Sequence, residues 1–187
     1  MRIAVLTVSD RAAQGAYEDE SGPVLMALIE EHFHQLTDLY HICPDDWREI
    51  KRALEKWCDD ARMDLILTTG GTGFAPRDVT PEATRAVIER EAPGLVHAML
   101  AASLEKTPHA MLSRAAAGIR GNTLIVNLPG SPRAARENFL AILPALPHAL
   151  ELLRGAGADA HALEHPIDAI YAFPSREMEA DRINQKI

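Results

Sequence analysis

The sequence predicts an α/β domain with three layers, in which helices cover both faces of a mostly parallel central sheet. Two observations lead to this fold class. Short apolar runs alternate with amphipathic segments along most of the 187 residues, which is the pattern of α/β/α domains. The apolar runs are continuous rather than alternately polar and apolar, as expected for strands that are buried on both faces.

Four apolar runs predict the buried strands, and most of the segments between them predict helices. The expected strands are residues 2–9, 38–43, 64–69 and 123–127, while 113–119 is either a short strand or irregular chain. The expected helices are residues 23–35, 47–60, 81–91 and 95–104, and residues 10–22 are expected to form a polar loop. A last helix starts near Pro132, is interrupted near Pro144 and ends at Arg154, before Gly155.

The chain divides into an expected domain, residues 1–155, and a C-terminal extension, residues 156–187. A Gly/Ala-rich stretch at 155–162 has the composition of a linker, and several apolar side chains follow at 167–173. Such a segment is expected to pack on the domain or on a partner chain rather than to line a site.

Composition and charge restrict the function. The formal net charge of −8 argues against nonspecific nucleic-acid binding, which requires a basic face. An anionic ligand would therefore depend on local amides, a few basic side chains or a metal ion. The two cysteines form no paired framework or CxxC motif. Because no signal peptide or apolar run of transmembrane length is recognisable, a cytoplasmic protein without a membrane partner is expected.

A glycine-rich turn follows the strand at 64–69, within the sequence DLILTTGGTGFAPRDVTPE. Gly70, Gly71 and Gly73 allow a sharp turn and a close approach to a ligand, and bare amides at such a turn suit a phosphate. Thr80 is expected to cap the next helix, with Pro81 as its first residue. The spacing fits neither a P-loop nor the dinucleotide fingerprint.

Carboxylates and small polar residues follow the ends of the expected strands. If the sheet is largely parallel, the turns after Ser9, Asp45, Gly70–Asp78 and Asn127–Ser131 converge on one edge. Asp45 and Asp78 are hard oxygen ligands suited to Mg²⁺. Each also has a structural explanation: Asp45 could cap the next helix, and Asp78 could pair with Arg77 or cap its own loop. Asp10 could form a local ion pair with Arg11.

Four segments together carry a family resemblance: TVSDR at 7–11, TTGGTGFAPRDVTPEAT at 68–84, PHAMLSR at 108–114 and NLPGSP at 127–132. Over residues 1–155 the chain resembles the Mog-type molybdopterin adenylyltransferases of molybdenum cofactor biosynthesis. It is also similar to their MoaB-type relatives and to the G domains of plant and animal cofactor-assembly proteins. Tyr17, Glu18 and Asp19 fit the Mog-type branch.

The resemblance implies the molybdopterin-binding fold, a homotrimer, and a reaction of Mg-ATP with molybdopterin that gives adenylylated molybdopterin and pyrophosphate. A downstream metal-insertion protein would then take the product. The resemblance implies that Asp45 and Asp78 are the acidic residues tied to activity and the Mg²⁺ ligands. The implied substrate-binding residues are Ser9, Gly70, Gly71, Thr72, Gly73, Gly130 and Ser131, although Ser131 could equally be a turn residue.

Two other functions remain open. A noncatalytic MoaB-type protein that binds or carries molybdopterin would keep the glycine loop but release no pyrophosphate. A competence-protein-like nucleotide hydrolase would share the fold, and the RDVTPE sequence at 77–82 argues against it.

Overall fold

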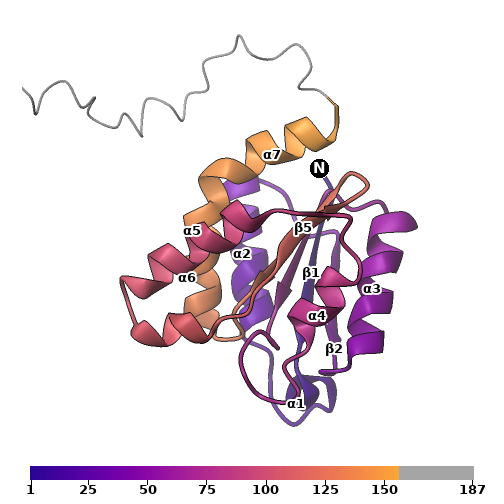
Figure 1. Ribbon diagram of the computed structural model, residues 1–187. Helices are drawn as coiled ribbons and strands as arrows, with labels where there is room; N and C mark the ends of the chain where they lie inside the picture. Colours follow the sequence, from indigo (N-terminus) through magenta and orange to yellow (C-terminus); the bar gives the residue numbers. More distant parts are fainter. Residues whose placement is uncertain (156–187) are drawn as a thin grey trace, which may run out of the picture.

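The computed structural model describes residues 1–155, which form a six-stranded sheet between two layers of helices (Figure 1). The strand order is β2-β1-β3-β6-β5-β4. Neighbouring strands among β2, β1, β3 and β6 are parallel, while β5 and β4 add an antiparallel edge. The strands are β1 (Ile3–Val8), β2 (Leu39–Cys43), β3 (Leu65–Thr69), β4 (Arg90–Glu91), β5 (Ala117–Arg120) and β6 (Thr123–Leu128). The predicted mostly parallel sheet is confirmed.

Helices cover both faces of the sheet. The helices are α1 (Asp10–Ala13), α2 (Ser21–Phe33), α3 (Trp47–Asp59), α4 (Thr80–Arg85), α5 (Pro93–Leu104), η1 (Pro108–Leu112), α6 (Pro132–Ile142), η2 (Leu143–Ala145) and α7 (Leu146–Leu153). One apolar cluster joins the sheet to α2, α5, α6 and α7, and a second joins it to α3 and α4. Within β1, Ile3 and Val5 belong to the first cluster, whereas Leu6 and Val8 belong to the second. The three layers therefore follow from the period of two along each buried strand.

The helix predicted at 81–91 is wrong over its second half. Helix α4 ends at Arg85, and Arg90–Glu91 pair with β5 as an edge strand. Hydrogen bonds from Glu89 N to Ile119 O (2.8 Å) and from Ala92 N to Ala117 O (2.8 Å) extend this pairing. The ambiguous segment before Gly121 supplies the partner strand, so a long-range pairing overrides the local helical pattern.

The polar loop predicted at 10–22 is also only partly correct. Its first residues form the short helix α1, and α2 already begins at Ser21. Because Ser9 accepts a hydrogen bond from Ala12 N (3.2 Å), the serine that directly follows β1 caps α1.

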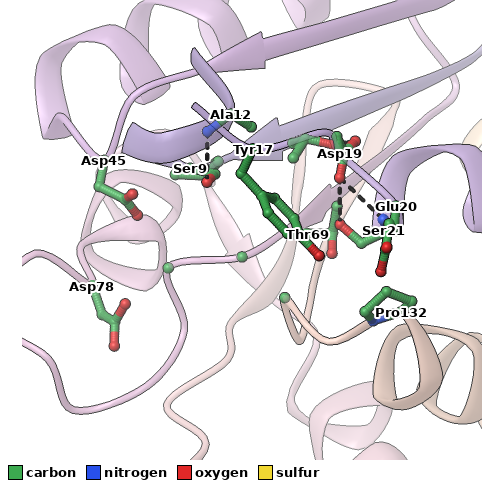
Figure 2. A pocket seen from close by; sticks show the side chains of 15 residues that line it. Ser9, Ala12, Tyr17, Asp19, Glu20, Ser21, Asp45, Thr69, Asp78 and Pro132 are labelled. Atoms are coloured by element: carbon green, nitrogen blue, oxygen red, sulfur yellow. Dashed lines mark hydrogen bonds between the residues drawn. The ribbon is translucent and has the colours of Figure 1, made fainter. Parts of the chain in front are cut away.

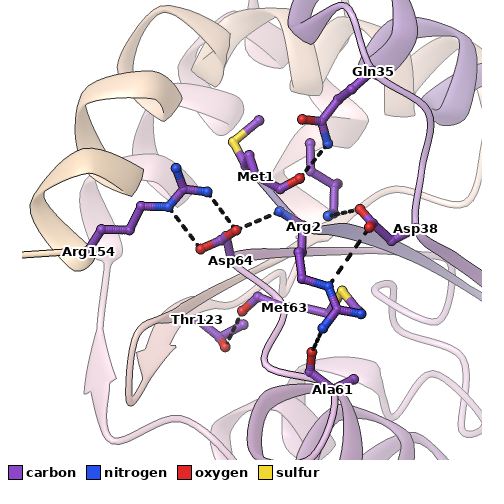
Figure 3. A network of polar contacts seen from close by, with 10 residues as sticks. Met1, Arg2, Gln35, Asp38, Ala61, Met63, Asp64, Thr123 and Arg154 are labelled. Atoms are coloured by element: carbon purple, nitrogen blue, oxygen red, sulfur yellow. Dashed lines mark hydrogen bonds and ion pairs between the residues drawn. The ribbon is translucent and has the colours of Figure 1, made fainter.

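The chain returns to the amino end of the sheet at the end of the described residues. The predicted interruption near Pro144 is confirmed as η2, and Gly155 has a φ of +78°. Figure 3 shows that the Arg154 guanidinium bonds both carboxylate oxygens of Asp64, at 3.0 and 2.7 Å. Asp64 precedes β3, so this contact fixes α7 far from the carboxyl ends of the strands. The expectations about the extension 156–187 lie outside the described residues. Within residues 1–155, no helix is long and apolar enough to cross a membrane.

Candidate functional site

A cavity of about 240 Å³ lies at the carboxyl ends of the parallel strands, where the loops after β1, β2, β3 and β6 meet (Figure 2). This is the edge at which open α/β sheets bind ligands. The loops are brought together because the four strands run parallel and in register. Six of the nine predicted site residues line the cavity: Ser9, Asp45, Gly70, Gly71, Asp78 and Gly130.

The other three predicted residues lie elsewhere. Thr72 and Gly73 continue the glycine loop and line a second cavity. Ser131 lines neither cavity, and its hydroxyl accepts a long hydrogen bond (3.5 Å) from Ala134 N at the start of α6. In this structure Ser131 caps α6. Ser9 caps α1 and also lines the first cavity.

The first two residues of the glycine loop, Gly70 and Gly71, pack so tightly that neither position has room for a side chain. Gly70 has a φ of +99°, and a Cβ there would lie 2.2 Å from Val8 O. At Gly71, a Cβ would lie 2.4 Å from Thr80 Oγ1 and 2.9 Å from Asp45 Oδ1. Thr80 is not the predicted helix cap: α4 begins with it, and its hydroxyl donates to Gly70 O at 2.9 Å.

Backbone amides of this loop are available to a ligand. Within residues 1–155, the N–H groups of Gly71, Thr72 and Gly73 have no protein acceptor. Their carbonyls are engaged on the other side, since Arg114 N donates to Thr72 O (2.9 Å) and Arg114 Nε to Gly73 O (2.6 Å). The guanidinium also bonds Asp78 O and Glu82. Free amides at a turn fixed in this way suit a phosphate.

Asp45 is free of the capping role that the sequence left open. Asp46 caps α3, accepting from Arg48 N (2.9 Å) and Glu49 N (3.1 Å). Asp45 Oδ2 accepts from Asp10 N at 2.8 Å, and its Oδ1 has no donor among the described residues. Burial raises the pKa of Asp45 above its ordinary value, and the negative charges of Asp10 and Asp78 also raise it. A cation would relieve this repulsion.

Asp78 lies on the facing loop and is likewise free of its neighbouring arginine. Its Oδ2 accepts from Ala75 N at 2.9 Å, so Asp78 caps its own loop, one of the two structural explanations, whereas Arg77 pairs with Asp10. A Cβ on Gly73 would lie 2.9 Å from Asp78 Oδ2, so this carboxylate also contacts the glycine loop. In the part of the chain that the structure describes, Asp78 Oδ1 has no donor.

The two carboxylates fit a magnesium ion that is shared with a substrate. Asp45 and Asp78 each have one oxygen held by a backbone amide and one oxygen open. No group of three or more His, Cys, Asp or Glu side chains suited to a metal occurs within residues 1–155. Mg²⁺ usually binds through one or two carboxylates together with substrate phosphates and water, and does not need such a group.

Asp19 is a cavity residue whose position the sequence did not predict. It accepts hydrogen bonds from the Thr7 and Tyr40 hydroxyls (both 2.6 Å), from Ser21 N and Oγ (3.0 and 2.9 Å) and from Gly22 N (3.1 Å). Burial opposes its ionisation, but these bonds hold the pKa of Asp19 below its ordinary value. Figure 2 shows the side chain beside Ser21, on the other side of the view from Asp45 and Asp78. Ser21 and Gly22 lie two and three residues after Asp19, but Thr7 and Tyr40 come from β1 and β2, and the local pattern does not indicate those two contacts.

A second cavity of about 310 Å³ lies on the other side of the glycine loop, between α5, η1 and α6. Its walls are largely apolar and include Met99, Leu100 and Leu112. The glycine loop therefore separates an acidic, polar cavity from an apolar one. The two cavities can together hold one ligand: its phosphate would lie at the glycine loop, beside a cation in the polar cavity, and a flat ring would lie in the apolar cavity.

Comparison with known proteins agrees with the geometry. Residues 4–148 match the family described as "Probable molybdopterin binding domain". The molybdopterin adenylyltransferase of Helicobacter pylori strain J99 is 44% identical over 156 residues, which cover 83% of this chain and 89% of that protein. The crystal structure of MoaB from Thermus thermophilus superposes with a TM-score of 0.78 and 49% identity, covering 82% of this chain and 96% of that one.

Some relatives are much longer than this chain, which matches only about a quarter of their length. Gephyrin of Dictyostelium discoideum is 47% identical over 160 residues, covering 81% of this chain but only 22% of that protein. The match there is to one part of a larger molecule. Since the family model covers most of the chain and the bacterial relatives match over nearly their whole length, the chain belongs to the MoaB/Mog family of molybdopterin-binding proteins.

Proposed function

We infer that the chain transfers the adenylyl group of ATP to the terminal phosphate of molybdopterin, releasing pyrophosphate. The observation that carries this function is the arrangement of one glycine loop with free amides between two open carboxylates and an apolar cavity. An oxygen of the molybdopterin phosphate attacks the α-phosphorus of ATP, a new P–O bond forms, and the bond to the pyrophosphate oxygen breaks. Such reactions require positioning and charge stabilisation rather than a covalent nucleophile.

The residues divide these tasks. The amides of Gly71, Thr72 and Gly73 would hold a phosphate oxygen, and their fixed direction orients it. Asp45 and Asp78 would hold the Mg²⁺, which neutralises charge on the transferred phosphate when bound. The apolar cavity beyond Gly73 has the character expected for the flat pterin ring.

A second function, that of a noncatalytic molybdopterin carrier, is favoured by one observation, the 49% identity with a MoaB protein. The two functions differ in the appearance of product. Purified protein with molybdopterin, ATP and Mg²⁺ should give adenylylated molybdopterin and pyrophosphate in equal amounts. If the protein binds molybdopterin but forms neither product, the carrier function replaces the enzyme.

The wider setting is also a proposal. We propose a homotrimer in the cytoplasm that passes its product to a metal-insertion protein, in line with the family resemblance. Light scattering at micromolar concentration tests the oligomeric state, and a mass equal to one chain would contradict it.

A further inference from the structure

We infer that Asp10 and Arg77 form a positioning pair that sets the two site carboxylates relative to one another. The inference rests on the proposed function, because it concerns the Mg²⁺ site of Asp45 and Asp78. Neither Asp10 nor Arg77 is expected to bind the cation. Their role is to hold together, by hydrogen bonds, the loops that follow β1, β2 and β3.

The first step is the contact between Asp10 and Asp45. Asp10 N donates to Asp45 Oδ2 at 2.8 Å, and Asp45 N donates to Asp10 Oδ1 at 3.0 Å. This reciprocal pair of hydrogen bonds joins the loop after β1 to the loop after β2. The orientation of the Asp45 carboxylate therefore depends on where Asp10 lies.

The second step connects Asp10 to the third loop. Arg77 Nε and one terminal nitrogen bond the two carboxylate oxygens of Asp10, at 2.9 and 2.7 Å. This bidentate geometry is directional as well as attractive. Because Arg77 directly precedes Asp78, the same contact fixes the backbone that carries the second carboxylate. Asp10 is thus bound at once to Asp45 and to the chain at Asp78.

The third step is energetic. The Arg77 and Asp10 side chains are 61% and 32% exposed, and ion pairs of this kind contribute little to folding. The pair contributes little to the stability of the fold, but it connects three loops around Asp45 and Asp78. Its main effect should therefore be on the positions of these two carboxylates. Outer residues that orient metal ligands typically affect metal affinity by about 10- to 100-fold.

Arg77→Gln distinguishes a positioning role from a purely electrostatic one, because the two roles predict opposite changes in cation affinity. Removing a positive charge near a cation site should tighten cation binding if charge alone matters. If Arg77 positions the carboxylates, the same change should weaken it. A matched control is Arg120→Gln, because Arg120 bonds Asp59 with the same bidentate distances, 2.9 and 2.7 Å. That pair lies at the opposite edge of the sheet, next to the start of β6.

The experiment titrates Mn²⁺, as a paramagnetic substitute for Mg²⁺, into full-length protein with an ATP analogue whose α–β bridge is a methylene group. We expect Arg77→Gln and Asp10→Asn each to weaken Mn²⁺ binding about 10-fold. The double variant should be little weaker than either single variant, because both changes break one contact. Arg120→Gln should bind Mn²⁺ like wild type, and all variants should melt within a few degrees of it.

The outcomes separate this inference from the proposed function. If wild-type protein binds no Mn²⁺ with the analogue, the metal site itself is refuted and the inference fails with it. If wild type binds and Arg77→Gln binds equally or more tightly, the positioning role is refuted while the metal site stands. If Arg77→Gln weakens binding of the metal-free analogue and leaves Mn²⁺ affinity unchanged, Arg77 contacts the nucleotide directly, and the inference is equally overturned.

Discussion

Replacing Gly73 with alanine should impair the site while leaving the fold intact. The φ of Gly73 is outside the left-handed region, so alanine can adopt its backbone conformation. A Cβ there would lie 2.9 Å from Asp78 Oδ2, and within residues 1–155 the only other atom that it would meet within 4 Å is Cγ of the same side chain, at 3.8 Å. The substitution therefore displaces the Asp78 carboxylate, and with it the hydrogen bond that this carboxylate accepts from Ala75 N.

The displacement gives the expected size of the effect. An ordinary contact begins near 3.4 Å, so the Asp78 oxygen must move by about half an ångström from its position at 2.9 Å. A misplacement of 1 Å at an active site can cost about 10²-fold in rate, so half of that should cost about 10-fold. In free energy of activation this is about 1.4 kcal/mol.

The assay is the rate of adenylylated molybdopterin formation as a function of Mg²⁺ concentration, with thermal unfolding in parallel. Gly94→Ala is the matched control, because a Cβ at Gly94, in the first turn of α5, meets no atom of the described residues within 4 Å. It should keep wild-type turnover. If Gly73→Ala melts like wild type and turns over at the wild-type rate, the position of the Asp78 carboxylate does not control the reaction.

Three further outcomes are expected. Asp78→Asn should lower turnover by about 10²-fold or more while molybdopterin binding stays within a few-fold, as measured by kinetics and by titration. Arg154→Gln should lower the free energy of unfolding at neutral pH, because the hydrogen bond from Arg154 holds the pKa of Asp64 below its ordinary value. Urea titrations should show the difference in unfolding free energy between variant and wild type shrinking as the pH falls through the folded-state pKa of Asp64. Truncation after Gly155 should lower the melting temperature or loosen the oligomer but leave turnover within a few-fold, and a folded oligomer without turnover would contradict this.

The buried strands were predictable because their signal is local. In β1, β3 and β6 every residue is buried, so each appears in the sequence as a continuous apolar or β-branched run. The convergence of their loops then followed from parallel pairing alone. Edge strand β4 carries no such signal, since both of its residues are exposed and its identity depends on pairing with a segment almost thirty residues away.

The site was less predictable because each of its polar side chains could form hydrogen bonds either with residues nearby in the sequence or with distant ones. Pro-Asp-Asp predicts a helix cap, but the sequence cannot say that Asp46 caps and Asp45 does not. Asp10 has an arginine beside it, yet pairs with Arg77, 67 residues away. Thr80 has a sequence position suited to a helix cap, but its hydroxyl donates a hydrogen bond to the carbonyl of Gly70. In each case the choice depends on which loops the sheet brings together.

The acidic character of the cavity bears on how it can hold an anion. The loop amides attract phosphate, but Asp45 Oδ1 lies so close to Gly71, and Asp78 Oδ2 so close to Gly73, that a Cβ at either glycine would approach it to 2.9 Å. Two carboxylates beside a phosphate repel it unless a cation lies between them. The chain as a whole, with a net charge of −8, offers no general attraction for anions. Under the proposed function, the arrangement would therefore select a phosphate that arrives with its metal ion, which is the form in which Mg-ATP would enter.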